Sequence, residues 1–555
     1  MSLIVNNLNV TLGNSCVLNN VSLKVADGER VGLVGSSGSG KSMLIRAVTG
    51  LLPEGAKVSG SCKLGDLQTV GASDIEIAKL RGKYVGVVFQ QANRALNPVL
   101  TVEQQVSLPL RIHYLLNDDD VHNRVCNMLE KVGLSPKLAS KRTFELSGGQ
   151  QQRVGIATAL ITYPKLILAD EPTTALDSVT QRDVVSMLTS LVDDMGASML
   201  FVTHDFSVLS HSAQRCYVLD SGNLVDSACV KDLLGNPKVT STRILVESAR
   251  KLTLRAKNSE SAFSESASAS DEDASASAKD TSTENISDSI CKSENSATLL
   301  SAKNIHVIFG SGKKSSEVLK GVDLNLKVGE SLAIIGGSGS GKTTLIRSIL
   351  GLQKISEGTI EYDSNIIALS NSKKSDFLAL RSETSLVFQH PFAALDPRWT
   401  VEKSVAEPLN IRHKNMNLSK EDVNNRVYSV LKLVGLKPEN FAQKYPHELS
   451  GGQAQCVAIA RALINDPRIL IADEPMSAID VAERTRILEA FATIRSKRPN
   501  MSCIFVSHDL GMIQHLATRV IVLNDGKIVE SGSVSQVLNY PKNSYTRELV
   551  NAAIL

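Results

Sequence analysis

The 555-residue sequence has no long apolar run. A helix that crosses a bilayer needs about 20 mostly apolar residues, whereas the apolar runs here are short, as at residues 84–89 and 166–169. Runs of this length predict buried strands. The first residues, Met1 to Leu12, contain no basic segment followed by an apolar core. We therefore expect no secretory signal and a cytoplasmic protein.

The sequence also contains few cysteines and has little net charge. The eight cysteines form no C-x-x-C pair and no Cys/His spacing that would hold zinc or an iron–sulfur cluster. The 60 basic and 57 acidic residues leave a net charge of only +3, without the basic excess of a dedicated nucleic-acid binder. The sequence therefore predicts isolated reduced thiols and no nucleic-acid partner.

What is present is an internal repeat. The segment VGLVGSSGSGKSMLIRAVTGLL from Val31 returns as LAIIGGSGSGKTTLIRSILGLQ from Leu332. Likewise, ELSGGQQQRVGIATALI from Glu145 returns as ELSGGQAQCVAIARALI from Glu448. Because matched landmarks keep a nearly constant offset, we expect two copies of one fold with few insertions. The matched landmarks are Lys41 and Lys342, Gln90 and Gln389, Asp170 and Asp473, and His204 and His508.

A low-complexity segment separates the copies. Residues 258–297 hold nine Asp/Glu and two Lys among mostly Ser, Ala and Thr, with no apolar period. Such a segment predicts a flexible acidic tether that keeps both halves at high effective concentration, and a regulatory or binding role stays open. We predict a first domain over 1–250, a linker over 251–298 and a second domain over 299–555.

Within each half, short β-branched runs alternate with longer amphipathic stretches. This pattern predicts a mixed α/β domain with a mainly parallel sheet covered by helices. The alternating segments at the start of each half, LIVNNLNVTL and LSAKNIHVIF, predict a small antiparallel sheet before the first parallel strand.

Both halves contain a glycine-rich phosphate loop, G-x-x-x-x-G-K-[ST], between an apolar strand and a helical pattern. Backbone N–H groups of such a loop wrap phosphates, its lysine reaches the β and γ phosphates, and its hydroxyl can bind magnesium. A chance glycine-rich turn is the alternative, but two chance matches at equivalent positions would be rare. The predicted ATP-binding residues are Gly35, Ser36, Gly38, Ser39, Gly40, Lys41, Ser42 and Met43, and Gly336, Gly337, Ser338, Gly339, Ser340, Gly341, Lys342, Thr343 and Thr344.

An Asp-Glu pair ends a later apolar strand in each half, in KLILADEP and RILIADEP. Beside a phosphate loop, Asp170 and Asp473 are placed to hold Mg²⁺, with the hydroxyls of Ser42 and Thr343 as further metal ligands. The following Glu171 and Glu474 would orient or deprotonate the attacking water. The alternative is that these carboxylates simply begin the next helix.

Two further polar positions repeat in both halves. His204 and His508 follow another apolar strand, and their equivalent spacing from the Asp-Glu pair favours a γ-phosphate contact. Gln90 and Gln389 follow the runs VGVVF and TSLVF. We predict that they contact the metal or a water molecule from a mobile loop and contribute to ATP binding.

The sequence Leu-Ser-Gly-Gly-Gln occurs at 146–150 and 449–453, roughly 20 residues before each Asp-Glu pair. At a helix N-terminus, Ser-Gly-Gly would form a second anion-binding surface. The ordered set of phosphate loop, glutamine, this signature, Asp-Glu and histidine resembles the ATP-binding cassette (ABC) ATPases over both halves. The resemblance implies two P-loop NTPase domains, each with a RecA-like mainly parallel core, a small antiparallel β subdomain and a helical signature subdomain.

The resemblance also implies that the halves pair head to tail around two ATP molecules, each contacted by the opposite signature. Both sites would be active but unequal. The second half has Phe309 where the family stacks an aromatic ring on adenine, while the first has Leu12, and Cys456 replaces the arginine that the first half keeps as Arg153. The signature residues so implied in ATP binding are Ser147, Gly149, Gln150, Ser450, Gly452 and Gln453.

Segments 93–102, 392–401 and 540–550 are similar to the oligopeptide, dipeptide and nickel importer branch, although the tail lacks the usual His-Pro. That likeness implies an ATP-hydrolysing subunit of an importer, with oligopeptides or dipeptides as the favoured substrates. It would act at the cytoplasmic face of a bacterial membrane with two transmembrane permease subunits and an extracytoplasmic substrate-binding protein.

Two alternatives compete with the importer. A cytosolic tandem cassette protein such as a ribosome-associated translation factor usually has a basic, helical linker, unlike this acidic one. A DNA-repair cassette would need coiled-coil or zinc insertions, and the sequence predicts neither.

Overall fold

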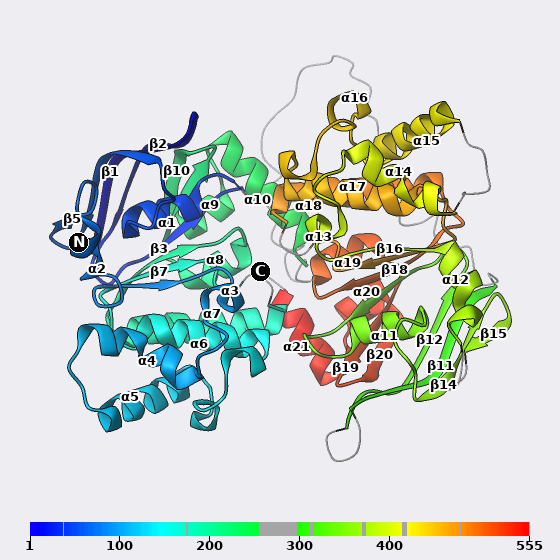
Figure 1. The fold of residues 1–555 in the computed structure, drawn as a ribbon, viewed down its shortest axis with the longest axis horizontal. Helices are drawn as coiled ribbons and strands as arrows, with labels where there is room; N and C mark the ends of the chain where they lie inside the picture. The colour runs from blue at the N-terminus through cyan, green and yellow to red at the C-terminus, as the bar shows by residue number, and fades with distance from the viewer. Residues whose placement is uncertain are drawn as a thin grey trace, which may run out of the picture. The chain divides into compact units, whose positions relative to one another are not determined.

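The computed structural model describes residues 1–36, 38–173, 176–254, 297–310, 315–368, 373–412, 419–476 and 479–553 (Figure 1). These residues form two compact units, one built mainly on Met1–Leu252 and the other mainly on Thr253–Ser477 and Ile487–Leu555. Most of the expected linker falls outside the described residues. The domain boundaries at 250 and 299 stay predictions.

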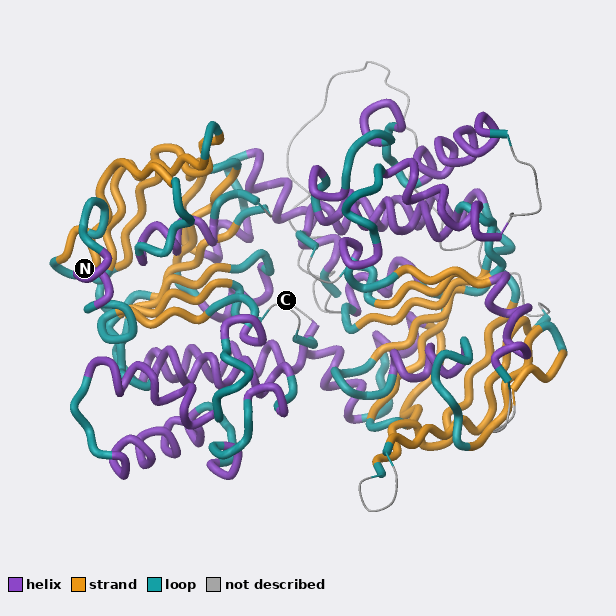
Figure 2. Tube along the Cα trace, in the orientation of Figure 1, coloured by secondary structure: helices purple, strands orange, loops and turns teal. Residues whose placement is uncertain are grey.

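The first unit is centred on a six-stranded sheet of order β10-β9-β3-β8-β7-β6. In Figure 2 strands are drawn in orange and helices in purple. Its neighbours pair in parallel except β10, which runs antiparallel to β9. The mainly parallel core expected from the sequence is confirmed. The strands are β3 (Arg30–Val34), β6 (Val85–Val88), β7 (Leu166–Asp170), β8 (Ser198–Val202), β9 (Arg215–Asp220) and β10 (Asn223–Cys229).

A second, four-stranded sheet of order β2-β1-β4-β5 is antiparallel throughout, as expected. It begins before the parallel sheet in sequence but gains β4 and β5 only after the first helix. Its strands are β1 (Leu3–Leu12), β2 (Ser15–Val25), β4 (Ala56–Leu64) and β5 (Leu67–Gln68).

Helices cover the parallel sheet and form a separate helical part in which α4 packs on α5 and α6. The helices are α1 (Lys41–Thr49), α2 (Asp74–Ala78), α3 (Ala92–Ala95), α4 (Val102–His113), α5 (Asp118–Lys131), α6 (Gly148–Leu160), α7 (Ser178–Asp194), α8 (Phe206–Ser212), α9 (Val230–Gly235) and α10 (Thr240–Leu252), with 3-10 turns at Pro136–Leu138 and Thr143–Glu145.

Two apolar clusters lie on opposite faces of the parallel sheet. In β7, Leu166 and Leu168 join the cluster beneath the antiparallel sheet and α1. The alternate residues Ile167 and Ala169 join the cluster formed with the helical part. Because side chains alternate along a strand, a strand that is apolar at every position is buried on both faces. This explains why these short runs are apolar at every position.

The second unit repeats this architecture, with sheet orders β16-β17-β18-β13-β19-β20 and β12-β11-β14-β15. Its strands are β11 (Thr298–Phe309), β12 (Ser316–Lys327), β13 (Ser331–Ile335), β14 (Glu357–Tyr362), β15 (Asn365–Ala368), β16 (Thr384–Val387), β17 (Ile469–Asp473), β18 (Ser502–Ser507), β19 (Arg519–Asn524) and β20 (Lys527–Ser533). Its helices are α11 (Lys342–Ile349), α12 (Leu378–Glu383), α13 (Pro391–Ala394), α14 (Val401–Arg412), α15 (Lys420–Leu433), α16 (Pro438–Phe441), α17 (Gly451–Leu463), α18 (Val481–Lys497), α19 (Leu510–Leu516), α20 (Val534–Asn539) and α21 (Ser544–Ala553), with 3-10 turns at Lys374–Phe377 and Pro446–Glu448.

Within the described part of the chain, the longest and most apolar helices still fall short of what a membrane crossing requires.

Candidate active sites

The first phosphate loop connects β3 to α1, and its backbone admits only glycine at key points. A Cβ atom on Gly35 would lie 2.1 Å from the carbonyl oxygen of Leu219 in the neighbouring β9. Gly40 precedes α1 with a φ of 104°, a conformation that side chains disfavour. The backbone at Gly35 therefore passes closer to the sheet than any other residue type allows, and Gly40 leads the chain into α1.

Lys41 is buried inside this loop. Its Nζ atom donates to the carbonyl oxygens of Gly35 and Ser36, each at 2.9 Å. Burial lowers the pKa of Lys41, although the carboxylates of Glu171 and Asp170 oppose the change. A buried ammonium group has lost most of its contact with water, so an additional anion beside it stabilises its charge.

The serine hydroxyls Ser39 and Ser340 occupy equivalent places in the two loops. Each is buried, and neither hydroxyl has a hydrogen-bond partner among the described residues. A buried, unpaired hydroxyl costs free energy unless a ligand satisfies it. Both loops therefore have polar groups suited to phosphate oxygens.

A hydroxyl and a carboxylate meet beside the first loop, where β7 ends. The Ser42 hydroxyl donates to Oδ1 of Asp170 at 3.1 Å, and burial raises the pKa of Asp170. In the second unit Thr343 donates to Oδ2 of Asp473 at 3.4 Å, and burial likewise raises the pKa of Asp473. A hydroxyl and a carboxylate suit Mg²⁺, which keeps most of its ligands as water and phosphate oxygens.

Three strand ends bring a carboxylate, an amide and an imidazole together in the first unit. Gln90 follows β6, Glu171 follows β7 and His204 follows β8, and these strands are adjacent in the sheet. The Gln90 amide donates to Glu171 Oε2 at 2.7 Å, and His204 Nδ1 lies 3.2 Å from Oε1. Glu171 has a φ of 44°, a strained value for a non-glycine residue that is typical of functional sites.

The second unit repeats this cluster. Gln389 donates to Glu474 Oε2 at 2.5 Å, and His508 Nδ1 lies 3.2 Å from Oε1. The φ of Glu474 is 47°. Burial raises the pKa of this carboxyl, but the hydrogen bond with His508 and the charges of His508, Lys342 and His390 together outweigh burial, so the net pKa is lowered. Glu474 is thus held ionised in a fixed orientation.

The second loop also matches the first. Lys342 Nζ donates to the carbonyl oxygens of Gly336 and Gly337 at 2.8 Å each. Gly339 and Gly341 take φ values of 79° and 105°. Gly38 takes a φ of 78° in the first loop. Met43 and Thr344 lie in the first turns of α1 and α11.

The two signatures begin helices. Ser147 caps α6 by accepting from the Gln150 N–H at 3.3 Å, and the Gln150 side chain accepts from the Ser147 N–H at 3.1 Å. Ser450 and Gln453 form the same reciprocal cap on α17. Gly149 and Gly452 lie within these first turns. Each signature thus begins a helix, as expected. Anion binding there, and pairing of a signature with the opposite loop, stay predictions.

The halves differ at positions that the sequence singled out. Phe309 ends β11 and is 42% exposed, whereas Leu12 ends β1. Arg153 donates to the carbonyl oxygen of Val132 at 2.7 Å, and its counterpart Cys456 is buried. These differences lie around, not within, the clusters of Lys, Asp, Glu, Gln and His.

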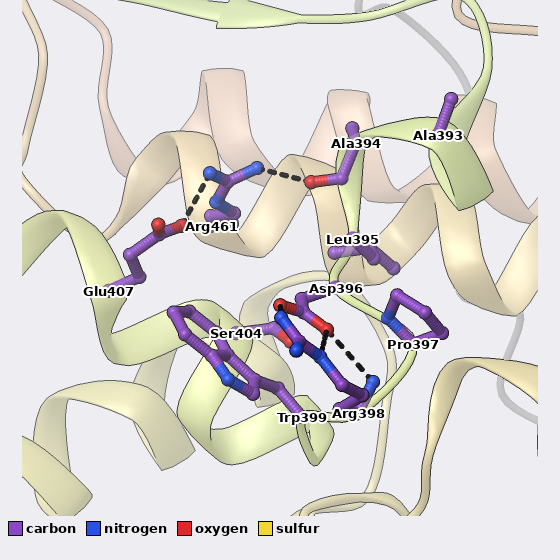
Figure 3. A pocket seen from close by; sticks show the side chains of 10 residues that line it. All are labelled: Ala393, Ala394, Leu395, Asp396, Pro397, Arg398, Trp399, Ser404, Glu407 and Arg461. Atoms are coloured by element: carbon purple, nitrogen blue, oxygen red, sulfur yellow. Dashed lines mark hydrogen bonds and ion pairs between the residues drawn. The ribbon is translucent and has the colours of Figure 1, made fainter.

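A pocket of about 450 Å³ lies on segment 392–401, directly after the Gln389 loop (Figure 3). Arg461 of α17 crosses it, donating to Glu407 at 2.5 Å and to the Ala394 carbonyl at 2.7 Å. The Ser404 hydroxyl is buried there without a partner among the described residues. The pocket is lined by Ala393, Ala394, Leu395, Asp396, Pro397, Arg398, Trp399, Ser404, Glu407 and Arg461.

Sequence reasoning missed one residue beside a phosphate loop. The Tyr545 hydroxyl accepts a hydrogen bond from the Gly337 N–H at 2.7 Å. In the sequence, the tail that contains Tyr545 indicated only a similarity to the importer branch and no contact with a phosphate loop. A contact across 208 residues has no local sequence signal.

Known proteins resemble this chain over nearly its whole length. The family model described as ABC transporter matches residues 18–174 and 319–477. The chain is 33% identical to the oligopeptide transport ATP-binding protein OppD of Mycobacterium tuberculosis, over 96% of this chain and 94% of the relative. It is 32% identical to the peptidoglycan transport ATP-binding protein YejF of Agrobacterium fabrum (97% and 93%) and to the glutathione import ATP-binding protein GsiA of Salmonella choleraesuis (96% and 86%). The chain therefore belongs to the ATP-binding proteins of the ABC transporter family, with two cassettes in one polypeptide.

Proposed function

We propose that this chain binds and hydrolyses ATP to energise an ABC importer, most of all for oligopeptides or dipeptides, through separate transmembrane subunits. The observation that carries the proposal is the duplicated cluster in which an ionisable carboxylate, Glu171 or Glu474, is held by a glutamine and a histidine next to a phosphate loop. Membership of the ABC family implies ATPase activity.

The residues fit ATP with Mg²⁺. In the second site Lys342 would exchange its two loop carbonyls for phosphate oxygens, and the Ser340 hydroxyl would gain a partner. Thr343 and Asp473 would hold the metal, which neutralises phosphate charge. Glu474 would accept the proton of the attacking water, since Gln389 and His508 fix its carboxylate.

The first site would work in the same way through Lys41, Ser42, Asp170 and Glu171. We further propose that the cassettes close head to tail, so that Ser450 and the helix start of α17 complete the first site and α6 completes the second. Closure would then depend on ATP in both sites, because each phosphate group is shared by two anion-binding surfaces.

The partners would be two permease subunits and an extracytoplasmic substrate-binding protein, with this chain on the cytoplasmic face of the membrane. The pocket on segment 392–401 supports this, because it adjoins the loop of Gln389 and thereby the hydrolytic carboxylate. A permease seated there would sense the state of the site. The relatives named for oligopeptide and glutathione transport favour peptides as substrates.

Uptake by cells tests this function. The chromosomal copy would be replaced by the double variant Glu171→Gln and Glu474→Gln, and uptake of labelled oligopeptides, dipeptides and glutathione would be measured. We expect uptake of at least one peptide class to fall to the level of a deletion strain. Wild-type uptake of all three by the double variant would overturn the proposal of a peptide importer.

A further inference from the structure

The C-terminal helix α21 contacts the second phosphate loop through one side chain, Tyr545. Its hydroxyl accepts the Gly337 N–H at 2.7 Å. The other end of that peptide group is the Gly336 carbonyl, which accepts from Lys342 Nζ at 2.8 Å. One peptide group therefore joins the tyrosine to the lysine of the phosphate loop.

In the nucleotide-free loop, the hydrogen bonds at both ends of this peptide group polarise each other and fix the orientation of its plane. Once Lys342 exchanges the Gly336 carbonyl for phosphate oxygens, the bond from Gly337 to Tyr545 would still hold this plane. The flanking geometry leaves this plane little freedom, because a Cβ atom on Gly336 would lie 2.1 Å from the Leu523 carbonyl oxygen. The loop is thus pressed against β19 on one side and held by a phenol hydroxyl at its next residue. Such bracing orders the loop before any phosphate arrives.

The tyrosine is itself firmly placed. Glu530 of β20 accepts the N–H groups of Lys542 and Asn543 at 2.9 and 3.1 Å, which fixes the chain entering α21. Asn543 then accepts the Tyr545 N–H at 2.9 Å. Leu549 and Val550 of α21 are buried, and the helix contacts α19 and β20 of its own unit.

The first cassette has the same order of tail helices, α9 and α10, but its described residues show no hydrogen bond from the tail to the phosphate loop. Its helix α10 is tied to β10 by the Thr242 hydroxyl, which donates to Asp226 at 2.9 Å. The residue equivalent to Tyr545 is Ser241, which is shorter by a whole phenol ring. The two sites therefore differ in how the start of the phosphate loop is supported.

We propose that Tyr545 is a positioning residue that pre-orders the second phosphate loop and raises the affinity of the second site for ATP, with no counterpart among the described residues of the first site. The inference rests on the nucleotide sites of the proposed function. One net hydrogen bond predicts that its loss weakens nucleotide binding by about 3- to 10-fold.

Equilibrium binding of Mg-AMPPNP to the full chain tests the inference by calorimetry. A Lys41→Ala background should remove binding at the first site, so that the measured Kd is that of the second site. In this background Tyr545→Phe should raise the Kd by about 3- to 10-fold. Because the phenyl ring keeps its packing, the nucleotide-free melting temperature should fall by no more than about 2–4 °C, the shift expected for the loss of one hydrogen bond. The matched control is Ser241→Ala in a Lys342→Ala background, which should leave the Kd of the first site unchanged.

An unchanged Kd in Tyr545→Phe would overturn the inference. So would a loss of affinity that comes with a fall in melting temperature larger than one hydrogen bond explains, because the residue would then support the fold of the unit as a whole. If the Lys41→Ala parent bound no nucleotide at all, the proposed nucleotide site itself would fail, and the inference with it.

Discussion

The first residue of each phosphate loop offers a sharp test of how the loop is built. In Gly35→Ala, the new Cβ atom would stand 2.1 Å from the Leu219 carbonyl oxygen and 2.7 Å from the Ser39 hydroxyl. The carbonyl is backbone in the middle of a sheet and cannot rotate away. Either the loop or strand β9 has to move.

The size of the effect follows from that distance. Real Cβ contacts stop near 3.0 Å, so the loop and β9 have to separate by about 0.9 Å. Overpacking of this kind costs about 1–3 kcal/mol. The overpacking weakens the pairing of β3 with β9. It also displaces the phosphate loop from the position in which its N–H groups would bind phosphate. We expect nucleotide affinity at the first site to be lost.

Hydrogen exchange read by mass spectrometry localises the damage in the intact chain. Peptides covering β3 and β9 should exchange faster in Gly35→Ala, while peptides of the second unit keep wild-type rates. Gly336→Ala, whose Cβ atom would meet the Leu523 carbonyl oxygen at 2.1 Å, should give the mirror result. Gly235→Ala is the control, because a Cβ atom there meets nothing within 4 Å.

Unchanged exchange in β3 and β9, or wild-type binding of nucleotide by Gly35→Ala, would refute this reasoning. It would mean that the loop can relax at no cost and that its close approach to the sheet is unimportant.

Three further predictions concern the sites and the thiols. Glu171→Gln and Glu474→Gln should each slow hydrolysis by about 10²- to 10⁴-fold at the altered site, with different residual rates in a steady-state ATPase assay; matched residual rates would contradict unequal sites. Chelation of Mg²⁺ should abolish hydrolysis and readdition should restore it, so activity that persists in excess EDTA would argue against the assigned metal ligands. Burial raises the pKa of Cys216 to about 12, so at pH 8 about one such thiol in 10⁴ is ionised; iodoacetamide should therefore label exposed Cys229 long before Cys216, and equal labelling would contradict this packing.

Much of the fold was predictable because its signals are local. The repeat, the apolar strand runs and the loop glycines each act within a few residues, and the serine caps of α6 and α17 follow from Ser-x-x-Gln spacing. The two sheets and their parallel and antiparallel character are confirmed. The later arrival of β4 and β5 in the antiparallel sheet could not be predicted from alternation at the start of each half alone.

The contacts within the sites were harder to predict from the sequence. Gln90, Glu171 and His204 each follow a strand, but their meeting depends on β6, β7 and β8 being neighbours, and sequence pattern does not order strands. The glutamine was predicted to contact metal or water, and the structure places its amide against the glutamate. The contact of Tyr545 depends on tertiary packing alone.

Affinity capture of the tagged chain from detergent-solubilised membranes, followed by identification of the bound proteins and an ATPase assay, tests the central claim most directly. We predict that polytopic membrane proteins co-purify with an active ATPase. Ribosomes or nucleic acid without a membrane partner would contradict an energising role in transport.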